Sequence, residues 1–92
     1  MESAIYNYPI EWAHENRIEL PTNSEFLSMH VWNGKPTLWY KHNPINVAKR
    51  TVTIIMRATG KNLSSELFPG EDFITTLLFY KDGEVYHFFF KH

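Results

Sequence analysis

The sequence predicts a single, mainly β domain over residues 1–92, an antiparallel sheet of about six or seven strands folded into a small sandwich or open barrel. Asn33-Gly34 follows a run in which apolar and polar residues alternate, and Asp82-Gly83 separates two further apolar runs. Both dipeptides favour two-residue hairpin turns, because both of their positions tolerate positive φ. The length of 92 residues is that of one domain.

In the first hairpin, the alternation and the turn predict the same pairing of strands. A two-residue turn at Asn33-Gly34 places three apolar pairs on one face: Val31 with Pro36, Met29 with Leu38, and Leu27 with Tyr40. Proline has no N–H to donate to a sheet ladder. We therefore expect the strand that contains Pro36 to begin at a sheet edge.

The second hairpin joins residues 73–81 to residues 84–91. A two-residue turn at Asp82-Gly83 opposes Phe79 with Tyr86 and Leu77 with Phe88 on one face, and Leu78 with His87 on the other. Both faces are largely apolar, which is typical of strands that are covered on both sides. We expect this hairpin to be central in the sheet or covered by a partner subunit.

The rest of the chain supplies shorter elements. The β-branched run from Arg50 to Arg57 predicts another strand, and residues 4–8 and 17–20 are short candidate strands that precede Pro9 and Pro21. Residues 62–68 predict at most one short helical turn, because Pro69-Gly70 ends it.

The composition excludes several classes of chemistry. The chain has no cysteine, which excludes disulfides, thiolate catalysis and cysteine-ligated zinc. Its five histidines show no compact metal-ligand spacing, and neither a Gly-x-Ser-x-Gly elbow nor a catalytic carboxylate pair is recognisable. We therefore expect a binding protein that is not an enzyme and holds no metal or cofactor. The formal net charge of −1 argues against long nucleic acid as a binding partner.

The chain shows no features of export or membrane insertion. Its first residues lack a basic stretch followed by an apolar run, and no apolar segment approaches the roughly 18–20 residues that span a bilayer. We expect a cytoplasmic protein with no membrane partner.

Basic residues gather at both ends of the strand predicted over residues 50–57. Arginine offers a planar fork to phosphate, lysine a point charge, and Thr-Gly a hydroxyl beside accessible backbone amides. The candidate phosphate site comprises Lys49, Arg50, Thr51, Arg57, Thr59, Gly60 and Lys61. The two clusters are about 20 Å apart along one strand, so a dimer would be needed to bring both around one ligand. The alternative is that these basic residues prevent the sheet edges from pairing with other strands and increase solubility.

Aromatic residues make up 16% of the chain, which exceeds the obvious need of a core this small. Trp39 and Tyr86 are candidates for stacking on a nucleobase. A second core layer or an interface between subunits is the other explanation for Trp39, and we expect a homo-oligomer. His87 lies among apolar neighbours and is expected to be a hydrogen-bonded structural residue.

Short motifs along nearly the whole chain resemble, in order, those of a family of uncharacterised phage and prophage proteins of about this length. The motifs are Tyr8-Pro9, Glu19-Leu20-Pro21, Asn33-Gly34, Leu38-Trp39, Lys49-Arg50-Thr51, Thr59-Gly60, Phe73-Ile74-Thr75-Thr76 and Val85-Tyr86-His87-Phe88-Phe89. Lys61 stands where the family has histidine, and the segment between Arg50 and Thr59 is about two residues longer.

The resemblance implies a small protein made during infection in the host bacterial cytoplasm. One role that it implies is counter-defence, in which the protein sequesters a mononucleotide or cyclic nucleotide signal in pockets between subunits. A second class is an inhibitor or accessory factor that docks on a host or phage protein, for example by strand addition. A third is a purely structural phage component.

Overall fold

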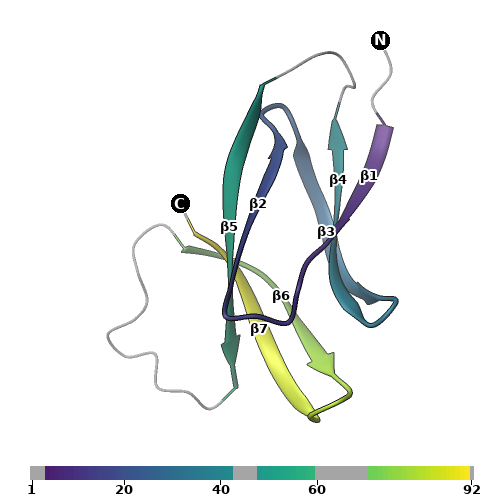
Figure 1. Ribbon diagram of the computed structural model, residues 1–92, viewed down its shortest axis with the longest axis vertical. Coiled ribbons are helices and arrows are strands. Elements are labelled where there is room, and N and C mark those ends of the chain that lie inside the picture. The colour runs from purple at the N-terminus through teal and green to yellow at the C-terminus, as the bar shows by residue number, and fades with distance from the viewer. Residues whose placement is uncertain (1–3, 43–47, 60–70, 92) are drawn as a thin grey trace.

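The computed structural model describes residues 4–42, 48–59 and 71–91, and these residues form seven β-strands and no helix (Figure 1). The strands are β1 (Ala4–Pro9), β2 (Glu15–Pro21), β3 (Glu25–Trp32), β4 (Lys35–His42), β5 (Lys49–Ala58), β6 (Glu71–Phe79) and β7 (Glu84–Lys91). The prediction of a mainly β fold with six or seven antiparallel strands is confirmed. The helical turn expected over residues 62–68 lies outside the described residues.

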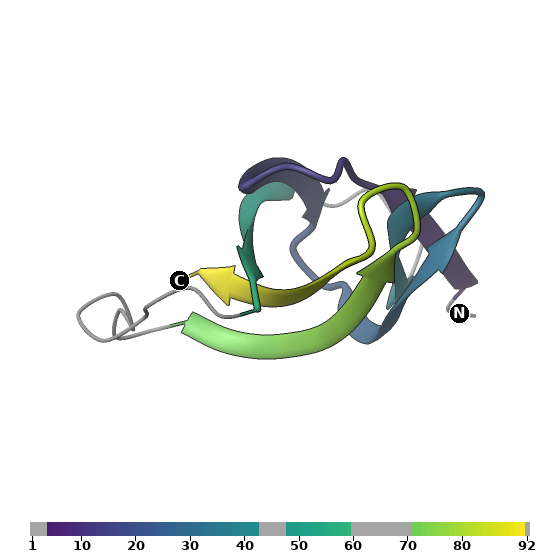
Figure 2. The ribbon, with the colours of Figure 1, turned by 90° about the horizontal axis from the view of Figure 1, so that it is seen from below.

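The strands form two antiparallel sheets that face each other. One sheet has the order β1-β4-β3 and the other has the order β2-β5-β7-β6. Figure 2 shows the four-stranded sheet curving from β2 at the top to β6 at the bottom, and β6 lies beside β3 of the other sheet. Since no ladder joins the two sheets among the described strands, the arrangement is an open two-layer structure and not a closed barrel.

The core lies between the sheets and follows the period of two that β-strands impose. Side chains of alternate residues point inward, so each strand contributes every second residue to the core. Met29 and Leu38 come from the three-stranded sheet, and Ile54 and Phe88 come from the four-stranded sheet. The remaining buried side chains of this core are Ile10, Ile18 and Leu20.

Trp12 fills one end of the space between the sheets. Its indole ring stacks on Phe79 with 4.3 Å between ring centroids, and its Nε1–H donates a hydrogen bond of 2.7 Å to the carbonyl of Gly34. The ring also lies 6.1 Å from the rings of Tyr86 and Phe88. Trp12 therefore connects the turn of the first hairpin to the second hairpin and covers this end of the core, which is called the closed end below.

The first hairpin has the predicted two-residue turn, in which Asn33 and Gly34 take φ values of 53° and 76°. The pairing of Met29 with Leu38 is confirmed. The pairing of Leu27 with Tyr40 is wrong, because a bulge between Phe26 and Ser28 places Phe26 opposite Tyr40 and leaves Leu27 42% exposed. The extra residue turns the Phe26 ring toward Phe90 of the other sheet, 5.4 Å away.

The expectation that Pro36 marks a sheet edge is wrong, because β4 is the middle strand of its sheet. The turn makes Trp32 and Lys35 the closing pair of the hairpin, so the backbone groups of the next residue, Pro36, point away from β3. On that side the carbonyl of Pro36 accepts a hydrogen bond of 2.8 Å from the N–H of Ile10. Only one bond of the ladder is lost, at the end of β1.

The second hairpin has a longer turn than expected. Residues 80–83 form the loop, and Leu77, not Phe79, pairs with Tyr86. Gly83 has a φ of 69° and no other residue of the loop has positive φ, whereas the predicted turn needs two such residues. Because the slip is by two residues, side chains from Thr75 to Phe79 stay on their predicted faces, whereas a bulge between Phe73 and Thr75 shifts the pairing of Phe73 by one further residue. The expectation that this hairpin is central in the sheet is confirmed for β7 and wrong for β6, because β6 is an edge strand.

Candidate functional site

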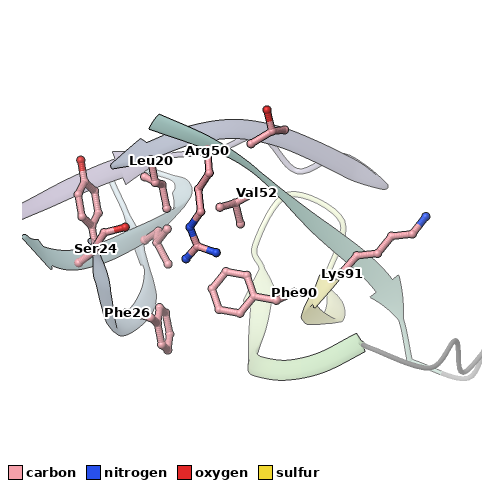
Figure 3. Close-up of a pocket in the computed structure, with 10 residues that line it drawn as sticks. Leu20, Ser24, Phe26, Arg50, Val52, Phe90 and Lys91 are labelled. Carbon is pink, nitrogen blue, oxygen red and sulfur yellow. The ribbon is translucent and has the colours of Figure 1, made fainter. Parts of the chain in front are cut away.

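A cavity of about 310 Å³ opens between the sheets at the end opposite Trp12 (Figure 3). It lies where β2, β3 and β5 meet the ends of β4 and β7. This volume is at the lower end of the range typical of small-molecule sites, which is about 300–1,000 Å³. The lining residues are Leu20, Ser24, Phe26, Leu38, Tyr40, Arg50, Thr51, Val52, Phe90 and Lys91.

Arg50 is the residue of β5 that points into this cavity. It pairs with Leu20 of β2, and it shares the inward face of β5 with Val52 and the buried Ile54. Figure 3 shows the Arg50 guanidinium between Val52 and Phe90, directed into the space between the sheets. The strand therefore places a permanently charged group on its otherwise apolar face.

The described part of the chain places no negative charge beside Arg50 in the cavity. Among residues 4–42, 48–59 and 71–91, no aspartate or glutamate lines the cavity. With the residues that the structure describes, the Arg50 side chain makes no hydrogen bond or ion pair. The second cation of the lining is Lys91, whose side chain points away from the cavity in Figure 3. The cavity thus offers one inward cation to an anionic group.

Three residues with hydroxyl groups, Ser24, Tyr40 and Thr51, add to the polar part of the lining. The Ser24 hydroxyl donates a hydrogen bond of 2.6 Å to the carbonyl of Pro21, so it presents its lone pairs to a ligand. Burial raises the pKa of the Tyr40 hydroxyl above its usual value, and the neighbouring Tyr6 and Tyr8 raise it further. Tyr40 therefore stays neutral and can donate a hydrogen bond.

The rest of the wall is apolar and partly aromatic. Phe26 and Phe90 come from different sheets and meet edge to face, with an interplanar angle of 87°. Tyr40 also belongs to a stack outside the cavity, in which its ring lies 6.0 Å from Tyr6 and 5.7 Å from His42. The cavity can hold a small ligand that combines an apolar or aromatic body with an anionic group.

The first predicted basic cluster lies partly in the cavity. Arg50 and Thr51 line it, whereas Lys49 does not. The difference follows from alternation, because Lys49 pairs with Pro21 and points to the opposite face of the sheet from Arg50. Of the three residues, only Arg50 places a charge between the sheets.

The second predicted cluster lies at the other end of β5 and has different contacts. The Arg57 guanidinium forms an ion pair with Glu71 at 3.1 Å, and the two side chains are only 9% and 4% exposed. The Thr59 hydroxyl donates to the carbonyl of Val85 at 3.0 Å. Gly60 and Lys61 lie outside the described residues. The structure therefore does not bring Arg57 or Thr59 to Arg50 within one chain.

His87 is hydrogen-bonded through both ring nitrogens, as expected for a structural residue. Its Nε2 lies 2.8 Å from the Thr59 hydroxyl and its Nδ1 lies 2.9 Å from the Thr76 hydroxyl. Because Thr59 uses its proton toward Val85, the hydrogen-bond network assigns the proton of the neutral ring to Nε2. Thr76 then donates to Nδ1, and the three side chains tie β6 and β7 to the residue after β5.

Trp39 and Tyr86, the predicted base-stacking residues, lie outside the cavity. Trp39 is on the outer face of the three-stranded sheet, 6.2 Å from Trp32 and 6.1 Å from His30. Tyr86 packs beside Trp12 at the closed end. Their stacking role stays a prediction.

The rings that line the cavity are Phe26, Tyr40 and Phe90. Alternation with the buried Leu38 and Phe88 marks Tyr40 and Phe90 as inward-facing, so the sequence contained a signal for both. Phe26 could not be found in this way, because the bulge reverses its expected face.

Tyr86 gives a test of the second hairpin at alkaline pH. Its hydrogen bond of 2.6 Å to the Asp82 carboxylate, with partial burial and the charges of Asp82 and Glu84, raises the pKa of Tyr86 to about 12. A raised pKa means that the folded state holds this proton more tightly than the unfolded state. The resulting stability is fully present below pH 10.0, the ordinary pKa, and is lost as the pH rises through about 12.

We therefore expect the free energy of unfolding of the wild type to fall more steeply than that of Tyr86→Phe as the pH rises above about 10. Urea denaturation of both proteins over this range measures the difference. Parallel pH profiles would contradict the hydrogen bond.

The described parts of the chain offer no group of three metal-ligating side chains. Within residues 4–42, 48–59 and 71–91 there is also no helix long and apolar enough to cross a membrane.

The family described as a domain of unknown function, DUF7352, matches residues 1–92. The chain belongs to this family. No curated protein and no solved structure matches it. Membership of DUF7352 agrees with the sequence resemblance to an uncharacterised family, whereas the phage origin stays a prediction. The function of this DUF7352 chain is therefore inferred from the residues that line the cavity.

Proposed function

We propose that this protein binds a small organic anion in the cavity between its two sheets, with Arg50 as the partner of the anionic group. The observation that carries the proposal is the direction of Arg50. It is a cation on the inward face of a strand, beside a partly aromatic cavity to whose lining the described residues contribute no carboxylate. The protein acts by binding and holding the ligand, and no catalytic step is part of the proposal.

The energetics of an inward-facing charge support this role. A charge that is removed from water without a partner costs free energy, and apolar residues of similar size replace it in most cores. Arg50 lies at the mouth of the cavity and remains exposed, so water solvates the guanidinium when the cavity holds no ligand. A carboxylate or phosphate can replace that water with a charge-assisted, bidentate hydrogen bond.

A nucleotide is the ligand class that fits this combination of groups best. Its phosphate would bind Arg50, and its base would lie among the rings of Phe26, Tyr40 and Phe90. One nucleotide unit suits the size of the cavity, so a cyclic oligonucleotide would place one unit inside and extend beyond the mouth. Sequestration of such a signal in the bacterial cytoplasm, as a phage counter-defence protein, is the biological role we propose for this binding.

The experiment compares two substitutions that remove the same charge from adjacent residues. Arg50→Met removes the inward cation, and Lys49→Met removes the outward one. Ligands are first identified by a thermal-shift screen of nucleoside monophosphates, cyclic mononucleotides, cyclic dinucleotides and small aromatic carboxylates. At 100 times its Kd, a ligand adds about 2.7 kcal/mol of stability, which raises the Tm by several degrees.

We expect Arg50→Met to weaken binding by roughly 10- to 150-fold, which corresponds to the 1.5–3 kcal/mol of a charged hydrogen bond. Calorimetric titration of the ligand measures this loss. Lys49→Met should bind as the wild type does, and both variants should keep the wild-type Tm within a few degrees. Equal binding to wild type and Arg50→Met would place the ligand elsewhere, and a hit confined to carboxylates would exclude the nucleotide class.

The second candidate function is that of a factor that docks on another protein. It is favoured by the exposed Trp32, which is 50% exposed and packs against Trp39 on the outer face of the three-stranded sheet. In this case Arg50→Met would leave the interaction intact, while Trp32→Ala would weaken it in a pull-down from a bacterial host lysate.

A further inference from the structure

The four edge strands of the described sheets differ in how well they are protected from pairing with another strand. Edges are usually blunted by charged side chains, bulges, prolines or neighbouring elements. Along its length β2 carries Glu15, Arg17 and Glu19. β3 and β6 each contain a bulge, and the two strands lie beside each other. These three edges are therefore poor templates for an additional strand.

The remaining edge, β1, has a regular register with β4 from Ala4 to Pro9, with no bulge and no charged side chain. Two of its large side chains face solvent, Ile5 at 64% and Tyr6 at 40% exposure. Its one protective feature is Pro9, at the end of the strand. Among the described strands, β4 is its only ladder partner, so the other side of β1 is an open edge.

The direction of each backbone group on β1 follows from the first hairpin. Trp32 and Lys35 close the two-residue turn, so β4 directs the groups of Lys35 and every second residue after it toward β3. The intervening residues face β1, as the bond from the N–H of Ile10 to the carbonyl of Pro36 shows.

Tyr6 and Tyr8 pair with two of these intervening residues, Tyr40 and Leu38, and therefore turn their N–H and C=O groups toward β4. Ile5 and Asn7 turn theirs to the open edge.

We propose that β1 pairs with β1 of a second copy of this chain, antiparallel and about a two-fold axis at Tyr6. In this register Ile5 lies opposite Asn7 of the second copy, and Asn7 lies opposite Ile5. All four N–H and C=O groups that these two residues present at the open edge then find partners. The product is a continuous six-stranded sheet with the order β3-β4-β1-β1-β4-β3.

The side chains of β1 favour a second copy over an unrelated strand. A two-fold axis brings identical segments together, and like charges opposite each other are destabilising. β1 has no charge to repel its copy, whereas β2 would meet its own three charged side chains. The axis also places the two exposed Tyr6 rings side by side, and aromatic cross-strand pairs stabilise a sheet.

The first experiment compares Asn7→Pro with Asn7→Ala by sedimentation velocity. Proline is tolerated where the N–H faces away from the sheet, so Asn7→Pro should keep the ladder with β4 but block the open edge. We expect the wild type and Asn7→Ala to sediment as dimers and Asn7→Pro to sediment as a monomer with an unchanged far-ultraviolet circular dichroism spectrum. A wild type that is monomeric at every concentration, or a folded Asn7→Pro that still dimerises, would overturn the proposal.

The second experiment tests the register and does not depend on the behaviour of proline. The chain has no cysteine, so each single cysteine is the only thiol of its variant. Tyr6→Cys places two thiols across the axis at a Cβ separation of about 4.5–5.5 Å, close to what a disulfide needs. Tyr8→Cys places them four residues apart, about 13 Å. Mild oxidation should cross-link Tyr6→Cys at least tenfold faster, and equal rates would contradict the two-fold axis at Tyr6.

Discussion

Replacing Phe88 with alanine is expected to destabilise the protein by about 3–5 kcal/mol, as is typical of a buried phenylalanine. Phe88 is 0% exposed and lies on the inward face of β7, between Met56 of β5 and Thr75 of β6. Its ring also lies 6.1 Å from that of Trp12, which closes the end of the core. Because a domain of this size has only about 5–15 kcal/mol of stability in total, the substitution should remove a large share of it.

Urea denaturation followed by tryptophan fluorescence measures this change. Phe73→Ala is the matched control, because it removes the same ring from a site on β6 that is 61% exposed. We expect the control to cost less than about 1 kcal/mol. Similar losses for the two variants would mean that Phe88 does not occupy the centre of the core.

Glu71→Gln is expected to destabilise the protein by about 3–5 kcal/mol, because it removes the carboxylate charge that faces the buried Arg57 guanidinium. One nitrogen of the Arg57 guanidinium lies 3.1 and 3.2 Å from the two oxygens of the Glu71 carboxylate. The pair joins β5 to the first residue of β6 on the outer face of the sheet, where both side chains are nearly inaccessible to water. Urea denaturation at neutral pH measures the loss.

The control for Glu71→Gln is the same substitution in an exposed ion pair. Glu15→Gln breaks the 2.9 Å contact with Arg17, which is 73% exposed, and should cost less than about 1 kcal/mol. The double variant Arg57→Met with Glu71→Leu should recover most of the loss, because apolar residues of similar size replace a buried pair at little cost. A double variant as unstable as Glu71→Gln would show that the charges themselves are not the cause.

The positions of Arg50 and Arg57 in the structure show how far local sequence can locate a candidate site. The two arginines have the same chemistry and flank the same β-branched run, so both were reasonable candidates for a phosphate. They differ because seven residues separate them, and an odd separation places their side chains on opposite faces of β5. The sequence alone could reveal this difference in face. It could not reveal that Arg57 pairs with Glu71, because Glu71 is fourteen residues away in the chain and is brought to Arg57 by sheet pairing.

By itself, the sequence determined the elements whose causes are local. The all-β class, the type I′ turn at Asn33-Gly34 and the inward-facing residues followed from the period of two and from the φ preferences of a few residues. The bulge at Phe26, the longer turn before Gly83 and the cavity at Arg50 were decided by the tertiary structure. Each depends on how one sheet packs on the other, and such packing energies come from residues far apart in the chain.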